Sequence, residues 1–105
     1  MKYLIDRASA ITPKDSLNDL LKSKNSLRIK LGVDPTAPDV TLGWYAILRA
    51  LRKFQDYGHT AVLILGEFTA QVGDPSGKSE TRTQLKENQI DDNSKGVLPI
   101  IKDML

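Results

Sequence analysis

Two different spacings of hydrophobic residues divide the middle of the chain into three elements. In residues 27–33, apolar side chains occupy every second position, which predicts a strand with one apolar face. The continuous apolar run at residues 60–65 predicts a second strand, covered on both faces. Between them, residues 42–57 carry apolar positions at helical spacing, and Gly58 is expected to end this helix. The side chains expected to face inward are Ile47, Leu48, Leu51 and Phe54.

The order of these elements indicates the fold class. A strand, a helix and a second strand in succession predict parallel strands joined by a right-handed crossover, so we expect an α/β fold. Residues 15–24 predict a short helix ahead of the first strand. Beyond residue 83, apolar residues recur at helical spacing, but Gly96 and Pro99 interrupt them. That segment predicts a kinked helix or two short helices.

Composition excludes several classes of protein. The chain has 105 residues, enough for one modest domain, and a net charge of +2, too small to indicate nucleic-acid binding by itself. No apolar run approaches the roughly 20 residues that span a bilayer, so no membrane contact is expected. The absence of cysteine excludes disulfides, thiolate nucleophiles and cysteine-based zinc sites. The start of the chain has no apolar core like that of a signal peptide, so the sequence is compatible with a cytoplasmic protein.

Two loops contain the candidate chemistry: residues 32–36 (GVDPT) and residues 73–78 (GDPSGK). Each follows an apolar run predicted as a strand, so both should lie at the carboxyl ends of parallel strands, where open α/β sheets bind ligands. The start of the helix that follows the first loop should attract phosphate. Asp74 could pair with an ammonium group, and Lys78 and Arg82, four residues apart, could stabilise developing negative charge.

Three stretches around these loops form a specific pattern: LRIKLGVDPTAPDVTLG, LRKFQDYGHTAVLILGEFTA and GDPSGKSETR. The pattern resembles the start of the catalytic domain of bacterial tyrosyl-tRNA synthetases, which are class I aminoacyl-tRNA synthetases. The resemblance implies a partial Rossmann-like unit of two or three parallel strands with flanking helices. There ATP, with magnesium as its counter-ion, and tyrosine form tyrosyl-adenylate before the tyrosyl group passes to tRNA. We expect an N-terminal helical lead-in at 1–26, a half Rossmann-like nucleotide-binding unit at 27–82 and a C-terminal helical segment at 83–105.

The resemblance implies five substrate-binding positions near the strand ends. Gly32 and Asp34 correspond to positions that line the pocket for tyrosine and ATP, and Thr36 to a position near the ATP phosphates. Thr69 corresponds to a position near the substrate, and Asp74 to the residue that contacts the tyrosine ammonium. Gly32 and Asp34 could instead form only a tight turn with an Asx cap, and this alternative stays open.

The resemblance also implies a helix start that binds nucleotide and two catalytic cations. Thr41 and Gly43 fall in the four-residue HIGH motif, in which the glycine lets adenine pack against the helix. Lys78 and Arg82 correspond to cations that meet pyrophosphate in the transition state, so Thr41, Lys78 and Arg82 are the implied catalytic residues. The two cations could equally lie in a solvated loop with a surface ion pair. No metal site is expected, and His59, the only histidine, is not expected to be catalytic.

Three residues depart from the family's pattern. The HIGH motif has histidine at its first and last positions, whereas this chain has Thr41 and Trp44. Thr41 can still donate a hydrogen bond, but Trp44 cannot contact phosphate in the same way, and its bulk would occupy the ATP cleft. Loss of one transition-state donor costs roughly 3 kcal/mol. Lys30 replaces a tyrosine often found on the first strand, and we expect Trp44 to be a packing or interface residue.

The last departure concerns segments that the sequence does not contain. It has no KMSKS-like loop, no second half of the sheet and no anticodon-binding helices. We therefore expect a truncated synthetase that is inactive alone and does not bind tRNA by itself. A half sheet would expose strand edges and an apolar face, which predicts self-association or a protein partner. Three hypotheses stay open: a truncated tyrosyl-tRNA synthetase, a catalytically dead paralogue that acts as a protein-binding or regulatory module, and a residual binder of ATP or tyrosine.

Overall fold

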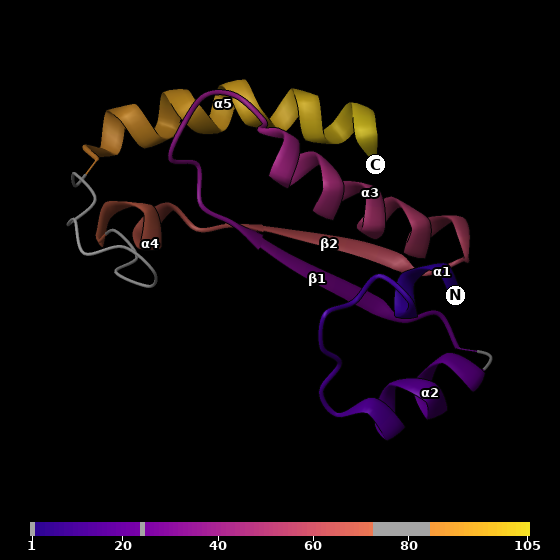
Figure 1. Ribbon diagram of the computed structural model, residues 1–105. Helices are drawn as coiled ribbons and strands as arrows, with labels where there is room; N and C mark the ends of the chain where they lie inside the picture. The colour runs from indigo at the N-terminus through magenta and orange to yellow at the C-terminus, as the bar shows by residue number, and fades with distance from the viewer. Residues whose placement is uncertain (1, 24, 73–84) are drawn as a thin grey trace.

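The computed structural model describes residues 2–23, 25–72 and 85–105 of the chain (Figure 1). These residues form helices and strands in the order α1 (Lys2–Ile5), α2 (Lys14–Lys22), β1 (Arg28–Val33), α3 (Leu42–Asp56), β2 (Thr60–Leu65), α4 (Glu67–Val72) and α5 (Glu87–Met104). None of the helices in these ranges is both long and apolar enough to cross a membrane.

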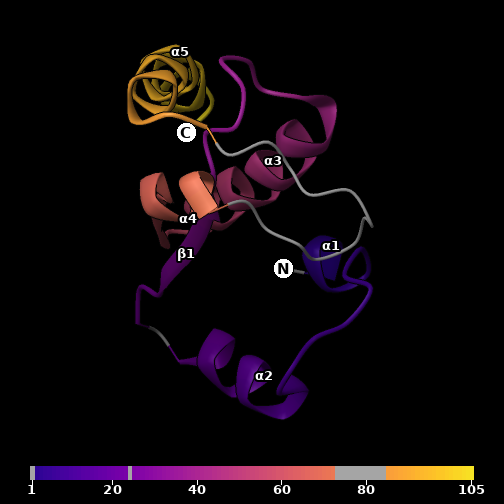
Figure 2. The same ribbon diagram turned by 90° about the vertical axis from the view of Figure 1, so that its left-hand side faces the viewer.

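β1 and β2 form one parallel sheet, in register from Arg28 opposite Thr60 to Val33 opposite Leu65. The predicted strand at 60–65 is confirmed to the residue, and the first strand begins one residue later than predicted. α3 and α5 lie on the same side of the two strands (Figures 1 and 2). The α/β fold class is therefore confirmed, as a partial Rossmann-like unit.

The core lies between this side of the sheet and the two long helices. Leu48 of α3 and Val97 and Ile101 of α5 are buried together, and Leu31 and Leu63 of the sheet pack against them. The two sheet leucines are register partners, so their side chains point to the same face and reach the same cluster. This cluster fixes α3 and α5 above the sheet.

One predicted core position is wrong. Ile47 is 48% exposed, whereas its neighbour Leu48 is 0% exposed. Successive helical residues point about 100° apart, and only one stripe of α3 faces the sheet and α5. Leu51 is buried and Phe54 is half-buried. The apolar spacing thus located the helix but not the edge of its buried stripe.

The opposite face of the sheet is more open than the sequence predicts. The apolar run of β2 predicts cover on both faces, but Ile64 is 50% exposed. Its register partner on β1 is Gly32, which is exposed as well. Because α3 and α5 lie on the same side of the strands, no described helix buries Ile64. For the described residues, the prediction of cover on both faces is wrong.

α5 is one continuous helix of 18 residues, so the alternative of two short helices is wrong. Pro99 lies inside it, where a proline removes one helical hydrogen bond. Burial of Ile90, Val97 and Ile101 along one stripe of the helix offsets that cost. Close packing explains why position 96 is a glycine, because a β-carbon there would approach the Pro38 carbonyl oxygen to 2.6 Å.

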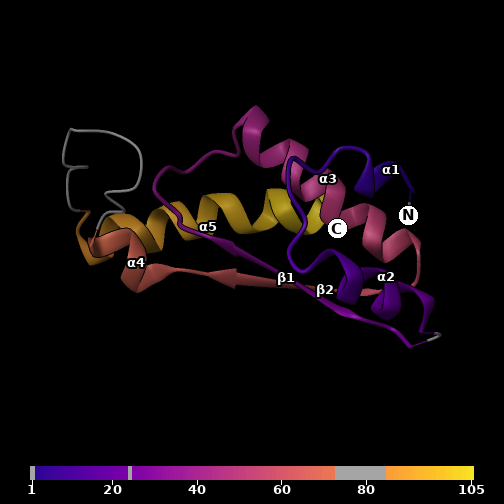
Figure 3. The same ribbon diagram turned by 60° about the horizontal axis from the view of Figure 1, so that its bottom comes forward.

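Two helices, α1 and α4, were not predicted. α1 precedes α2, and both lie near the amino ends of the strands, at the opposite end of the sheet from α4 (Figure 1). α4 begins two residues after β2 and lies beside the start of α5 (Figures 1 and 3). α4 therefore lies between β2 and residues 73–78, and the predicted position of this second loop at the end of the strand stays a prediction. Residues 73–78 themselves lie outside the described part of the chain.

Candidate functional site

Asp34 and Thr69 meet at the carboxyl end of the sheet. Asp34 is the first residue after β1, and Thr69 lies in α4. The Thr69 hydroxyl Oγ1 donates a hydrogen bond of 2.6 Å to Oδ1 of Asp34, across 35 residues of sequence. The parallel pairing continues beside them, because the Gly66 N–H donates to the Val33 carbonyl over 2.8 Å. The two strand ends thus bring two predicted site residues together.

The loop that follows Asp34 is held against α5. The Thr36 N–H donates to the Asp34 carbonyl over 2.8 Å, which makes a tight turn around Pro35. Pro35 is buried, and its carbonyl accepts a 3.0 Å hydrogen bond from Nδ2 of Asn93. Thr36 is exposed. The tight turn therefore leaves the Thr36 side chain accessible at the edge of the sheet.

Thr41 caps the start of α3. Its Oγ1 accepts a hydrogen bond of 3.4 Å from the Trp44 N–H. A β-carbon on Gly43 would meet no atom closer than Oγ1 of Thr41, at 3.8 Å, which is an ordinary contact. Packing within the described chain therefore does not require glycine at this position, although glycine costs a helix up to about 1 kcal/mol relative to alanine.

Trp44 takes up space between these elements. The half-buried indole lines a cavity of about 50 Å³ together with Asp34, Thr36 and Thr41, and Val97 of α5 forms part of its wall. Ligand pockets typically measure roughly 300–1,000 Å³. A cavity this small holds a few water molecules but not ATP. Trp44 therefore forms part of the wall of this small cavity, and its role toward ATP stays a prediction.

The remaining predicted residues lie apart from this cavity or outside the described part. Gly32 is exposed on the open face of the sheet, beside Ile64, and does not line the cavity. Asp74, Lys78 and Arg82 lie outside the described residues. Of the predicted residues, Asp34, Thr36 and Thr41 line the cavity. Thr69 is bonded to Asp34, and Gly43 lies next to the Thr41 side chain.

Sequence reasoning missed three residues that position this site. A β-carbon on Gly66 would overlap both Oδ1 of Asp34 and Oγ1 of Thr69. Asn93 and Gly96 hold the loop from α5. A glycine directly after an apolar strand is a sequence signal that could have identified Gly66. No local signal marks Asn93, because its partner lies 58 residues earlier.

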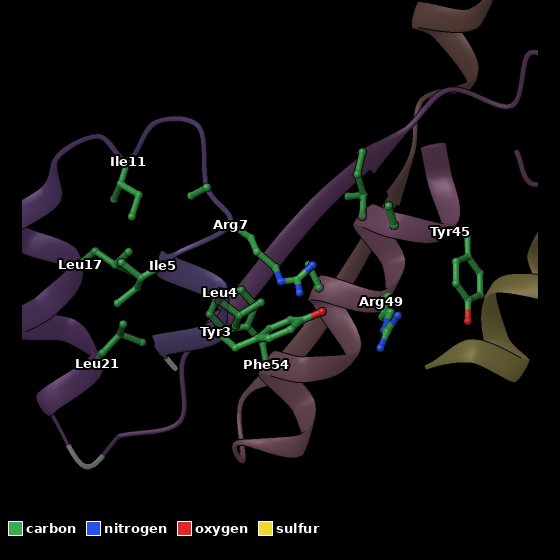
Figure 4. A pocket seen from close by; sticks show the side chains of 14 residues that line it. Tyr3, Leu4, Ile5, Arg7, Ile11, Leu17, Leu21, Tyr45, Arg49 and Phe54 are labelled. Carbon is green, nitrogen blue, oxygen red and sulfur yellow. The ribbon is translucent and has the colours of Figure 1, made fainter. Parts of the chain in front are cut away.

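A larger cavity lies away from this site. It measures about 690 Å³ and lies between the N-terminal segment and α3, with largely apolar walls that include Arg7 and Arg49 (Figure 4). The Arg7 guanidinium lies 4.2 Å from the centre of the Tyr3 ring. None of the predicted site residues lines this cavity. The predicted chemistry and the larger cavity are therefore in different places.

Asp56 and His59, which lie outside the site, each have hydrogen-bond partners in the structure. Lys53 and Arg52 contact Asp56 at 3.1 and 2.9 Å, and these hydrogen bonds lower the pKa of the Asp56 carboxyl. His59 accepts the Leu27 N–H on Nδ1 at 3.3 Å. Within residues 2–23, 25–72 and 85–105, no three His, Asp or Glu side chains are grouped to hold a metal ion.

Comparison with known proteins identifies the family. A family model described as "tRNA synthetases class I (W and Y)" matches residues 22–105. This chain belongs to that family. The resemblance drawn from the loop motifs is therefore confirmed, and the synthetase match covers both strands, α3, α4 and α5.

The relatives that this synthetase-family chain matches include several tyrosine–tRNA ligases. The one from Thermotoga maritima is 54% identical over 95 residues, which is 90% of this chain and 24% of the relative. That of Prochlorococcus marinus is 52% identical over 87 residues, 83% of this chain and 21% of the relative. That of Chlorobaculum tepidum is 54% identical over 79 residues, 75% of this chain and 20% of the relative. The chain thus spans about a quarter or less of the length of these ligases.

Proposed function

We propose that this chain is a tyrosyl-tRNA synthetase-like unit that is inactive by itself, and whose ancestral reaction is ATP-dependent tyrosine activation and tRNA charging. The observation that carries the proposal is the position of Trp44. It stands where the HIGH motif has its last histidine, and a cavity of only about 50 Å³ remains beside Asp34 and Thr41. ATP does not fit this space, which is why we expect the chain to be inactive by itself.

The ancestral roles of the site residues are part of the same proposal. Substrate binding is assigned to Gly32, Asp34, Thr36, Gly43, Thr69 and Asp74. Contact with the reacting phosphates is assigned to Thr41, Lys78 and Arg82. The 2.6 Å bond between Thr69 and Asp34 supports this assignment, and so does the unfilled space beside Gly43. A cytoplasmic location and the lack of tRNA binding by this chain alone stay predictions.

Two experiments test the synthetase proposal. Tyrosine-dependent pyrophosphate exchange with the purified chain should not exceed a blank without protein, and measurable exchange would contradict the proposal. Calorimetric titration with ATP, tyrosine and a non-hydrolysable tyrosyl-adenylate analogue then tests residual binding. Saturable heat that Thr69→Val removes and Thr60→Val keeps would support a residual binder, because Thr69 bonds to the Asp34 carboxylate whereas Thr60 begins β2 at the other end of the sheet.

A second function, protein binding through the open side of the sheet, is supported by exposed apolar side chains. Ile64 is 50%, Phe68 75% and Val72 57% exposed. Phe68 and Val72 lie one helical turn apart on α4, so they share a face of that helix. Neighbouring exposed apolar side chains mark interaction sites, and Phe68 and Val72 form such a pair on α4. This surface could take a second copy of the chain or a different protein.

Sedimentation at micromolar concentration tests the second function. We expect concentration-dependent association that Phe68→Ser weakens. Tyr57→Ser provides the matched control, because Tyr57 is also exposed, at 52%, but lies at the end of α3. A monomer at every concentration, together with no partner recovered that requires Phe68, would contradict this function.

A further inference from the structure

Gly66 lies where the two halves of the candidate site meet. Its N–H donates to the Val33 carbonyl at the end of β1, over 2.8 Å, and its carbonyl accepts the Ala70 N–H over 3.0 Å. The first bond continues the sheet, and the second begins α4. The Thr69 hydroxyl lies 3.1 Å from the same Gly66 carbonyl and 2.6 Å from Asp34 Oδ1. Gly66 is therefore in contact with both partners of the Asp34–Thr69 bond.

The lack of a side chain at this position has a specific steric reason. A β-carbon on Gly66 would overlap Asp34 Oδ1 and Thr69 Oγ1, the two atoms that share the hydrogen bond. Backbone conformation is not the reason, because Gly58 is the only glycine with positive φ in the described part of the chain. Alanine could therefore adopt the backbone of Gly66, and the obstacle lies in these two side chains alone.

We propose that Gly66 is a positioning residue of the candidate site: its missing side chain is what allows the Asp34 carboxylate and the Thr69 hydroxyl to bond. The inference rests on the proposed function for its consequence, since Asp34 and Thr69 are the substrate-binding residues assigned there. A β-carbon at position 66 would occupy the space that these two oxygens now fill. Any side chain there therefore forces Asp34 or Thr69 to move. The bond that orients the carboxylate is then lost.

A melting-temperature cycle tests the steric part without a ligand. Gly66→Ala should lower the melting temperature of the native chain by about 5 °C or more, the shift typical of a destabilisation near 1 kcal/mol in a domain of this size. In a chain that carries Asp34→Ala and Thr69→Ala, the same change should leave the melting temperature unchanged or raise it. An equal loss in both backgrounds would overturn the proposal.

Gly96→Ala is the matched control for this cycle. Its β-carbon would also collide, with the Pro38 carbonyl oxygen at 2.6 Å, but not with Asp34 or Thr69. Its cost should therefore be the same in both backgrounds. If the doubly substituted chain does not fold, the Thr69→Ala chain replaces it, and the cost of Gly66→Ala should still fall there. An undiminished cost in that chain would overturn the proposal.

Ligand affinity provides a second measurement, which a loss of stability alone would not change. If the native chain retains binding of tyrosine or ATP, Gly66→Ala should weaken that binding about tenfold below the melting temperature of every variant, and should weaken it no further when Thr69→Ala is already present. Additive losses would overturn the positioning role. If the native chain binds neither ligand, residual binding fails as a function, while the melting cycle still decides the role of Gly66.

Discussion

The Trp44 N–H donates a 3.4 Å hydrogen bond to Oγ1 of Thr41, so the two residues that depart from the HIGH motif are bonded to each other. Thr41 is the N-cap of α3, and Trp44 is the third residue of the helix. An N-cap oxygen satisfies one of the backbone donors that a helix start leaves unpaired. In this chain the motif therefore serves the stability of α3, and this role can be tested separately from any role in binding.

Removal of the cap should destabilise the chain. Thr41→Val keeps the shape of the side chain but removes the accepting oxygen, and we expect a loss of about 1 kcal/mol in the free energy of unfolding. Thr41→Ser keeps the oxygen and should lose much less. Urea unfolding of the two variants measures the difference. Equal losses would mean that the 3.4 Å contact contributes no stability.

Replacement of the indole should reopen the nucleotide side of the site. Trp44→His removes bulk from the wall of the 50 Å³ cavity and restores the residue of the HIGH motif. We expect ATP to bind at least about tenfold more tightly, a gain of ~1.4 kcal/mol. Trp44→Phe, which keeps an apolar ring, is the control and should not show this gain. Calorimetric titration measures the ATP affinity of the three chains. Equal affinity in all three would contradict the prediction that the Trp44 side chain blocks ATP binding.

Gly43→Ala should raise stability. Its β-carbon would meet nothing closer than 3.8 Å, so alanine adds helix propensity without a clash. We expect a gain of about 0.5–1 kcal/mol, read as a higher melting temperature. Gly96→Ala, inside α5, should have the opposite sign because of its 2.6 Å approach to Pro38. A melting temperature lowered by Gly43→Ala would show that the start of α3 is more crowded than the structure indicates.

Two neighbouring residues on α3 should differ sharply in their contribution to the core. Leu48 is 0% exposed and Ile47 is 48% exposed. Leu48→Ala leaves a cavity in the cluster with Val97 and Ile101, and should cost about 2–5 kcal/mol. Ile47→Ala should cost about 0.5 kcal/mol. Denaturant unfolding measures both, and similar costs would contradict the orientation of α3 on the sheet.

Stability near pH 4 should depend on Asp56. Lys53 and Arg52 hold the pKa of this carboxyl below its ordinary value of 3.8. A lowered pKa in the folded state stabilises the fold above the unfolded-state value, and this contribution is lost as the pH falls through the lowered pKa. Asp56→Asn should therefore melt below the native chain at pH 7, and the difference should shrink below about pH 4. A difference that stays constant with pH would exclude the ion pairs as its cause.

Local sequence was enough to predict the parts of the fold that depend on neighbouring residues. The β-branched apolar run predicted β2 to the residue, and Gly58 ends α3 with a φ of +87°, a conformation that favours glycine. The loop motifs also identified the family, which the match over residues 22–105 confirmed. These features depend on periodicity, on backbone freedom and on residues close together in the chain.

Only the tertiary structure decided which residues meet. It placed Thr69 on α4, kept α5 continuous through Pro99, and brought Thr69 within 2.6 Å of Asp34. It also gave Gly66 its steric reason, because one of the two side chains that crowd this position belongs to Asp34, at the end of the other strand. The sequence by itself determined the elements and the family, because these follow from local spacing. The arrangement of the site had to come from contacts across dozens of residues, since burial and collision depend on which surfaces pack together.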